Sequence, residues 1–135
     1  MPITPLQKKK ELYSDFNIDL VRHPVTNDVS RIINENSIKE SIRNIILTNW
    51  GERPFAPEFG GNITAQLFEN HTPITMKTIE TRVRKTIAKH EPRVELLGVS
   101  VNSDPDTNEL RVYIEFVSIN SENPQTIDVL LKRVR

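Results

Sequence analysis

The chain has 135 residues, and 18 Lys and Arg balance 18 Asp and Glu to a formal net charge of zero. This length favours one domain around a single hydrophobic core. The zero balance argues against a general nucleic-acid or membrane binder, which carries net positive charge. The chain contains no cysteine, which excludes disulfides, thiolate metal sites and cysteine nucleophiles. We therefore expect no nucleic-acid partner, no membrane partner and no cofactor.

The other metal and targeting signals are also missing from the sequence. His23, His71 and His90 lie far apart and do not have the spacing of zinc ligands. The apolar stretches are too short to cross a bilayer, and the basic run near the N-terminus is not followed by the apolar segment of a secretory signal. We expect no metal site, and a chain that stays in the cytoplasm where it is made.

Two parts of different character are expected at the N-terminus. Residues 1–13 contain two prolines and three consecutive lysines, which favours a flexible arm, and residues 14–135 are expected to form the single domain. Residues 16–20 alternate apolar and polar side chains, which predicts a short strand with one buried face. The pair His23–Pro24 ends this strand because proline lacks a backbone donor.

The first helix is predicted to begin at Ser37. Ser37 and Glu40 have the spacing of a capping box, in which each side chain accepts from the other residue's backbone N–H. Gly51 suits the left-handed position after a helix, so we expect the helix to end at Trp50–Gly51. Its buried face is predicted from four isoleucines at helical spacing: Ile38, Ile42, Ile45 and Ile46.

The middle of the chain is predicted to be an irregular loop followed by a second helix. Residues 51–62 are rich in proline and glycine, and we expect Phe55 and Phe59 to pin this loop to the core. A short helical turn is predicted over residues 63–68, and a longer helix from a cap at Thr75 to His90. Solvated surface and docking to neighbours are both open for its basic outer stripe of Arg82, Lys85 and Lys89. The apolar face is predicted to be Met76, Ile79, Val83 and Ile87.

The last third of the chain changes to an alternating pattern. Residues 97–101 and 110–116 alternate around the turn-rich segment 102–108, which predicts a β-hairpin, and residues 127–131 predict a final strand. The fold class is therefore α+β: helices packed on one face of a small, mostly antiparallel sheet, with a C-terminal hairpin plus a final strand.

Catalysis has one weak candidate in this sequence. Glu52, Glu58 and Glu69 lie close to aromatic residues, which could raise the pKa of one carboxyl for glycoside hydrolysis. Structural ion pairs or docking contacts explain the same carboxylates. We expect these three residues to be structural and the protein not to be an enzyme.

A more specific feature follows the second predicted helix. Pro92 ends the helix and holds Glu91 and Arg93 on either side of a rigid turn. This turn is either a helix stop with two solvated charges or an exposed docking point that loses little freedom on binding.

The chain resembles the family of baseplate wedge proteins of contractile-tailed phages that initiate the tail sheath. The same family includes baseplate components of type VI secretion systems. The likeness extends from about residue 11 to the end and rests on six runs: Leu12-Tyr13-Ser14-Asp15, Ser37-Ile38-Lys39, Gly51-Glu52-Arg53-Pro54-Phe55-Ala56-Pro57-Glu58-Phe59-Gly60, Gln66-Leu67-Phe68-Glu69-Asn70, Thr72-Pro73-Ile74-Thr75 and Glu91-Pro92-Arg93.

The resemblance implies a structural protein of the virion. It implies six copies in the inner baseplate, assembled in the host cytoplasm, in contact with other wedge proteins and the tail sheath protein, with the tail tube as a further candidate partner. It also implies that Glu91, Pro92 and Arg93 pack toward the wedge. A lysozyme-like name used in the family leaves a peptidoglycan-degrading enzyme as the alternative, and a secretion-system baseplate as another.

The final strand, together with the predicted hairpin, is the candidate edge for sheath assembly. An unpaired strand edge can template a strand of another chain. Side chains alternate along residues 127–131, and the basic end can guard against premature pairing. The predicted interface residues are Ile127, Val129, Leu131, Lys132 and Arg133.

Overall fold

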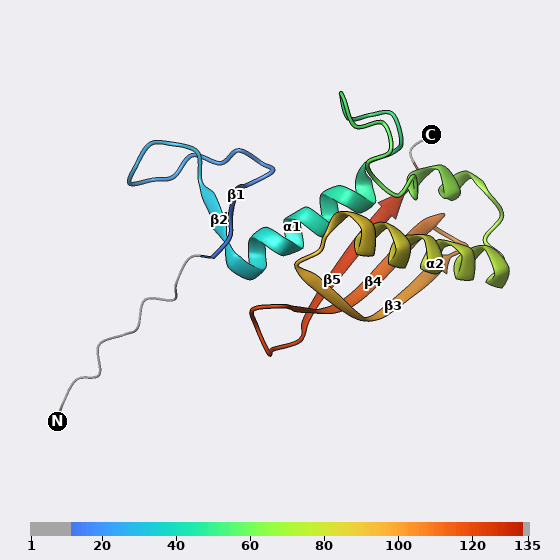
Figure 1. The fold of residues 1–135 in the computed structure, drawn as a ribbon. Coiled ribbons are helices and arrows are strands. Elements are labelled where there is room, and N and C mark those ends of the chain that lie inside the picture. Colours follow the sequence, from blue (N-terminus) through green and yellow to red (C-terminus); the bar gives the residue numbers. More distant parts are fainter. Residues whose placement is uncertain (1–11, 134–135) are drawn as a thin grey trace.

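The computed structural model describes residues 12–133 and has two helices packed on one face of an antiparallel sheet (Figure 1). The predicted α+β class is therefore confirmed. The elements in chain order are β1 (Ser14–Phe16), β2 (Arg31–Ile33), α1 (Asn34–Leu47), the 3-10 helix η1 (Thr64–Phe68), α2 (Pro73–His90), β3 (Val94–Asp104), β4 (Glu109–Ser118) and β5 (Gln125–Lys132).

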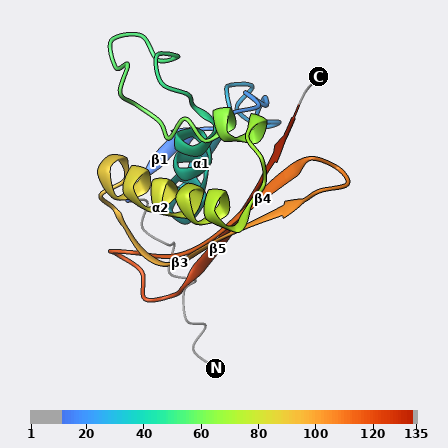
Figure 2. The same cartoon turned by 90° about the vertical axis from the view of Figure 1, so that its right-hand side faces the viewer.

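The main sheet has the strand order β3-β4-β5 with both pairs antiparallel. The predicted hairpin and final strand are confirmed, and the turn of the hairpin lies between Asp104 and Glu109, which pair with each other. Within residues 12–133, β5 pairs with β4 alone, so β3 and β5 form the two edges of this sheet. Figure 2 shows α1 and α2 on the same side of the sheet.

The core lies between the helices and this sheet. The predicted apolar stripes of both helices are confirmed, although Met76 is only partly buried at its edge. The sheet contributes alternate residues of each strand, including the fully buried ring of Phe116 on β4. Burial of this kind stabilises a domain by roughly 25 cal/mol per Å² of apolar surface. The helical and alternating patterns of apolar residues in the sequence thus identify the faces of the helices and of the sheet that pack together.

The helix starts differ from the prediction at both helices. The helix α1 begins at Asn34, with Ile33 as an extended N-cap that makes no side-chain cap bond, so the capping box at Ser37 and Glu40 is wrong. Ser37 is instead buried inside the helix, and Glu40 binds Arg43 at 2.9 Å. The helix α1 begins earlier than predicted because β2 runs directly into it. The side-chain oxygen of Asn34, its first residue, accepts from the Leu12 backbone N–H at 2.8 Å.

The helix α2 is capped by Thr72 rather than by the predicted Thr75. The Thr72 hydroxyl accepts from the Thr75 backbone N–H at 3.2 Å, and Pro73 occupies the first helical turn, where its missing N–H costs nothing. The end of α1 also differs, because the helix stops at Leu47 and Thr48 is extended. Gly51 has the expected positive φ of 81°, but in the loop and not as a helix cap.

The N-terminal segment forms a small ribbon outside the main sheet. The strand β1 pairs with β2 in antiparallel register, and the segment between them extends away from the helices (Figure 1). The predicted strand over residues 16–20 with one buried face is wrong, since Phe16, Ile18 and Leu20 are all exposed. Residues 1–11 of the predicted arm lie outside the described residues, and the domain boundary at residue 14 stays a prediction.

The loop between α1 and η1 has one of the two predicted aromatic anchors. Phe55 is fully exposed, with a positive φ of 63°, so its predicted role in pinning the loop is wrong. Phe59 packs instead on the ring of His90 at the end of α2, with ring centroids 4.9 Å apart, and beneath the guanidinium of Arg53 at 4.4 Å. The loop is thus attached to the end of α2 through Phe59, whereas Phe55 is exposed.

Candidate interaction site

The Glu91–Pro92–Arg93 turn connects α2 to β3 at one end of the sheet. The backbone N–H of Glu91 donates to the carbonyl of Ile87 at 2.8 Å and closes the last turn of α2. Pro92 prevents the helix from continuing. The carbonyl of Arg93 then accepts from the N–H of Ile119 at 3.0 Å, just beyond the end of β4. The turn is therefore fixed by backbone bonds on both sides.

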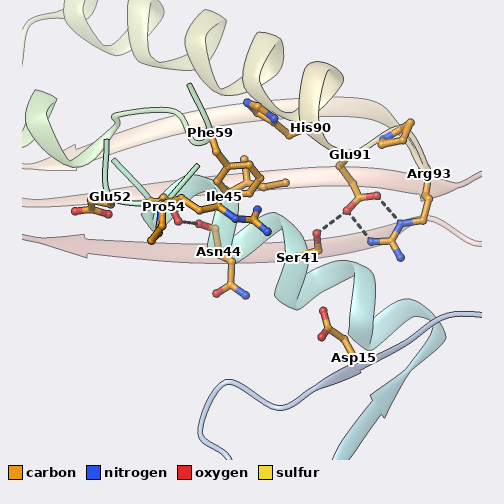
Figure 3. Close-up of a pocket in the computed structure, with 13 residues that line it drawn as sticks. Asp15, Ser41, Asn44, Ile45, Glu52, Pro54, Phe59, His90, Glu91 and Arg93 are labelled. Atoms are coloured by element: carbon orange, nitrogen blue, oxygen red, sulfur yellow. Dashed lines mark hydrogen bonds and ion pairs between the residues drawn. The ribbon is translucent and has the colours of Figure 1, made fainter. Parts of the chain in front are cut away.

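The carboxylate of Glu91 is buried and makes three short contacts. Arg93 donates from Nε to Oε1 at 2.6 Å and from Nη2 to Oε2 at 2.8 Å, which is the two-point geometry that arginine and carboxylate favour. The hydroxyl of Ser41 on α1 donates to Oε2 at 2.6 Å (Figure 3). Glu91 is 2% exposed, so neither alternative, a solvated charge or an exposed docking point, holds for this residue.

These contacts change the ionisation of both partners. Burial by itself raises the pKa of Glu91, but the hydrogen bonds from Arg93 and Ser41 and the charge of Arg93 outweigh burial and hold that pKa below its usual value of 4.5. The hydrogen bond to Glu91 raises the pKa of Arg93, against a smaller opposite effect of burial. The pair is therefore ionised, and it ties the start of β3 to α1.

Arg93 also connects the turn to the N-terminal ribbon. Its guanidinium lies 4.8 Å from the centre of the Tyr13 ring, directly before β1. The carbonyl of Tyr13 accepts from the N–H of Asn34 at 2.8 Å, and its hydroxyl accepts from Asn120 after β4. The turn thus holds the base of the ribbon, α1 and β3 in one arrangement. One of the family runs contains Tyr13, but no sequence signal placed Tyr13 or Ser41 against the turn, because their distance from it in the chain hides the contact.

A groove lies beside this turn and separates it from the loop after α1. Its volume is about 740 Å³, and Asp15 of β1 lies at one end and Glu52 of the loop at the other (Figure 3). Ile45 and Phe59 line its floor, and Pro92 is exposed at its rim. Arg93 has 30% of its side chain exposed, so Pro92 and part of Arg93 are what the turn presents to a neighbour.

The predicted interface residues of β5 divide into two groups. The side chains of Ile127, Val129 and Leu131 are buried in the core and are not available to a partner. Lys132 is exposed and pairs with Glu109 of β4 at 2.9 Å, and the Arg133 guanidinium lies 5.1 Å from the centre of the Phe68 ring. The edge of β5 can therefore offer its backbone and its outer face to a partner, and not the apolar side chains named from the sequence.

The turn and the basic end of β5 are not brought together. In the sheet register, Val94 next to the turn pairs with Ser118, whereas Lys132 pairs with Glu109 at the other end of β4. The sequence-predicted residues therefore form two separate surfaces at opposite ends of the sheet.

The ribbon of β1 and β2 carries a third surface, which was not predicted from the sequence. The ribbon exposes large apolar side chains close together in the chain, and contiguous exposed apolar surface marks interaction sites in soluble proteins. The alternation over residues 16–20 is the signal for this surface in the sequence, but alternation alone predicts burial within the same chain. The exposed apolar residues of this segment are Leu12, Phe16, Ile18, Leu20, Val21 and Val25.

The carboxylates considered for catalysis do not have the buried surroundings that the catalytic alternative requires. Glu58 is 85% exposed and lies 3.5 Å from Lys89. Glu52 is exposed and accepts from the backbone and the side chain of Asn49, at 2.8 and 3.0 Å, and Glu69 is exposed as well. None of the three therefore has the desolvated setting that the catalytic alternative requires, and the expectation of an ion pair is confirmed for Glu58.

The part of the chain that the structure describes has neither a group of metal ligands nor a helix able to cross a membrane. Among residues 12–133, no group of three or more His, Asp or Glu side chains is placed to hold a metal ion. In the same part of the chain, neither helix is both long and apolar enough to cross a membrane.

Comparison with known proteins assigns the chain to a family. The family model for "Baseplate wedge protein gp25" matches residues 34–123. A protein of that name from Enterobacteria phage T4 is 41% identical over 118 residues, which are 87% of this chain and 87% of that protein.

Solved structures with this fold include a crystal structure of a putative tail lysozyme from Geobacter sulfurreducens. It is 29% identical with a TM-score of 0.68, over 75% of this chain and 92% of that chain. A chain of the anti-feeding prophage baseplate is 22% identical with a TM-score of 0.63, over 89% of this chain and 85% of its own length, which supports the fold alone. The chain belongs to the baseplate wedge protein gp25 family and is a wedge component of a contractile-tail baseplate.

Proposed function

We propose that this subunit nucleates the tail sheath by accepting a strand of the first sheath ring at the outer edge of β5. The observation that carries the proposal is that β5 has one neighbour, β4, in the described part of the chain. Its other edge therefore has backbone N–H and C=O groups that no strand of residues 12–133 pairs, which is the requirement for strand addition.

The outer face of β5 carries charged side chains that disfavour strand pairing before the baseplate meets the sheath. Asp128 and Leu130 face away from the core, and Lys132 follows on the same side. Asp128 and Lys132 are each paired across to β4, with Arg111 at 3.8 Å and Glu109 at 2.9 Å. Charged side chains along an edge disfavour indiscriminate strand pairing, so a sheath strand must bring matching groups.

The row of paired residues across the sheet provides a direct test. Ser100 on β3, Tyr113 on β4 and Asp128 on β5 are neighbours in register, and all three are exposed. The chain has no cysteine, so Ser100→Cys, Tyr113→Cys and Asp128→Cys each introduce a single thiol. Neighbouring strands lie about 4.8 Å apart, and a disulfide needs Cα atoms within about 7 Å.

The expected result is specific to one edge. A cysteine in the sheath strand should form a disulfide with Asp128→Cys in assembled tails, but not with Tyr113→Cys, which lies one strand further away. Cross-linking to Ser100→Cys alone would transfer the proposal to the β3 edge and refute it for β5. This test is preferable to removing residues 127–135, because that deletion also removes three core side chains.

The wedge contact is proposed at the other end of the sheet. Glu91, Pro92 and Arg93 would act there by holding the ribbon and α1 in place, while Pro92 and the exposed part of Arg93 touch the neighbour. The exposed apolar side chains of the ribbon support this placement. We expect the variant with Glu91→Ala and Arg93→Ala to fold but not to co-purify with wedge proteins; normal co-purification would make the turn only a helix stop.

The remaining part of the proposal concerns the whole particle. We propose six copies in each baseplate, assembled in the host cytoplasm beside the tail tube, and a structural role without catalysis. Quantitative mass spectrometry of purified particles tests the copy number. The name of the Geobacter sulfurreducens protein makes peptidoglycan hydrolysis the alternative. Clearing of a peptidoglycan suspension by this chain, lost in Glu58→Gln and kept in Glu91→Gln, would establish that alternative.

A further inference from the structure

The outer face of α2 carries an excess of positive charge. Between Pro73 and His90 the helix has five Lys or Arg residues and one acidic residue, Glu80. The stripe opposite the buried face follows helical spacing, from Ile74 at the start of the helix to Lys85 and Lys89 near its end. The stripe is apolar and hydroxylic in its first half and basic in its second half.

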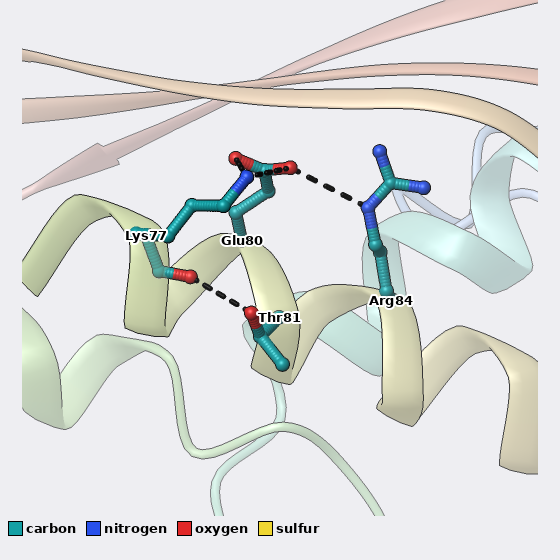
Figure 4. Close-up of polar contacts among 4 residues, drawn as sticks. All are labelled: Lys77, Glu80, Thr81 and Arg84. Carbon is teal, nitrogen blue, oxygen red and sulfur yellow. Dashed lines mark hydrogen bonds and ion pairs between the residues drawn. The ribbon is translucent and has the colours of Figure 1, made fainter. Parts of the chain in front are cut away.

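The single carboxylate of α2 pairs with Lys77 and Arg84 and not with the lysines near the end of the helix. Glu80 accepts from Lys77 at 3.1 Å and lies 3.5 Å from Arg84 (Figure 4). The hydrogen bond from Lys77 is the main reason that the pKa of Glu80 is lowered. Lys85 has no ion pair among the described residues, and Lys89 has one long contact of 3.5 Å to the exposed Glu58. The basic half therefore remains largely uncompensated.

The loop after α1 forms a wall beside this stripe. The indole N–H of Trp50 donates to the carbonyl of Gly60 at 3.0 Å, which holds the ring in place while leaving Trp50 56% exposed. The guanidinium of Arg82 lies 5.6 Å from the centre of that ring. An ordered and half-exposed tryptophan of this kind is typical of the residues that dominate binding energy at interfaces.

Two hollows on either side of Trp50 form one groove. They have volumes of about 780 and 510 Å³ and share Trp50, Lys85 and Thr86 in their linings. The first continues to Ile74 and the second to Lys89. Fifteen residues of helix separate those two ends, which at about 1.5 Å per residue gives a groove of roughly 22 Å.

We propose that this groove binds an acidic segment of a partner protein. An apolar side chain of that segment packs between Trp50 and Ile74, and its carboxylates face Lys85 and Lys89. Charge complementarity selects the partner, because an acidic segment is attracted to the uncompensated lysines and a basic one is repelled. The groove lies on the helical layer and involves neither the β5 edge nor the Glu91 turn, so the proposal does not depend on the proposed function.

The sole tryptophan of the chain is a built-in reporter for a titration. The probes are an amphipathic peptide of about 15 residues built from Glu and Leu, which matches the groove when helical, its Lys and Leu counterpart, and single-stranded DNA. We expect the Glu and Leu peptide to shift Trp50 emission to shorter wavelength with saturation. Equal binding of the Lys and Leu peptide would overturn the proposal, and tighter binding of DNA would assign the groove to nucleic acid and also overturn it.

Charge reversal supplies the matched comparison. Lys85→Glu with Lys89→Glu should weaken binding of the Glu and Leu peptide by about tenfold or more, equivalent to about 1.4 kcal/mol. Lys39→Glu with Arg43→Glu places the same change at the same spacing on α1 and should leave the affinity unaltered. Equal affinity for the α2 variant and the wild type would refute a role for the lysines.

Assembled baseplates test whether the groove is covered in the particle. Thr81→Cys lies in the groove on an exposed position, in a chain that has no other thiol. We expect maleimide to label this cysteine at least about tenfold more slowly in baseplates than in the free chain, because a bound segment lowers access to the surface by that factor when its occupancy exceeds about 90%. Equal labelling rates in the two states would show an empty groove and refute the proposal.

Discussion

The substitution Glu91→Ala tests whether the buried ion pair holds the α2–β3 junction together. It removes a carboxylate that accepts three bonds of 2.6 to 2.8 Å from Arg93 and Ser41. Breaking a buried pair costs about 3–5 kcal/mol when the remaining charge stays buried. Arg93 keeps 30% of its side chain in solvent, so water can compensate part of the loss. We therefore expect the lower end, about 3 kcal/mol.

Chemical denaturation measures this loss, and a double-mutant cycle assigns it. A loss of about 3 kcal/mol leaves a domain of typical stability folded and lowers Tm by roughly 10 °C. Arg93→Ala and the double variant should give a coupling energy of about 1.5–3 kcal/mol, because either single substitution removes the same bonds. Single-variant effects that add within about 0.5 kcal/mol, or a loss below about 1 kcal/mol for Glu91→Ala, would refute the claim that the ion pair stabilises the α2–β3 junction.

A local measurement separates this mechanism from general destabilisation. Arg93 holds Tyr13 at the base of the ribbon, and Arg22 lies in the exposed segment between β1 and β2. In Glu91→Ala, trypsin should cut after Arg22 faster than in a core variant of equal stability. Equal rates would mean that the ribbon does not depend on the turn.

Three further predictions follow from the same structure. The folded pKa of Glu91 lies below its ordinary 4.5, so the stabilisation by its carboxylate is complete above that pH and is lost as pH falls through the folded value. The difference in unfolding free energy between wild type and Glu91→Gln should therefore shrink below roughly pH 4.5. A difference that stays constant down to about pH 3 would contradict a lowered pKa for Glu91. A Cβ at Gly60, whose φ is +99°, would lie 2.2 Å from the carbonyl oxygen of Thr48, whereas Gly51 has φ +81° and open space around it. In urea denaturation, Gly51→Ala should lower the free energy of unfolding by about 1 kcal/mol and Gly60→Ala by clearly more. Equal losses for the two variants would argue against the close contact at Gly60. Phe116→Ala should cost about 3–5 kcal/mol, since the ring is completely buried, and a loss under about 1.5 kcal/mol in the same assay would mean that the core closes around the cavity.

The helical faces illustrate what periodicity can predict. Four isoleucines of α1 and three apolar residues of α2 are buried as their spacing predicted. Spacing works there because a helix exposes or buries whole stripes, whatever its partner is. The helix starts were less predictable. The start of α2 is fixed by the Thr72 cap with Pro73 in the first turn. The start of α1 is fixed by β2, which runs directly into the helix.

The N-terminal ribbon marks the limit of alternation as a signal. Residues 16–20 alternate like a half-buried strand, but only Phe16 of them lies in β1, and Phe16, Ile18 and Leu20 are all exposed. The pattern indicates that an apolar face exists and does not identify what covers it. A subunit of an assembly can leave that face to another chain, which a single sequence does not distinguish from a core.

The sequence by itself determined the α+β class, the three C-terminal strands, the buried stripes and, through the family likeness, the baseplate assignment. Those conclusions rest on local periodicity and on motifs, which are written along the chain. Only the tertiary structure decided that Glu91 is buried against Ser41, that the apolar side chains of β5 belong to the core, and that Trp50 and Lys85 share a groove. Each of these depends on contacts between residues distant in sequence, and desolvation and charge pairing act through space.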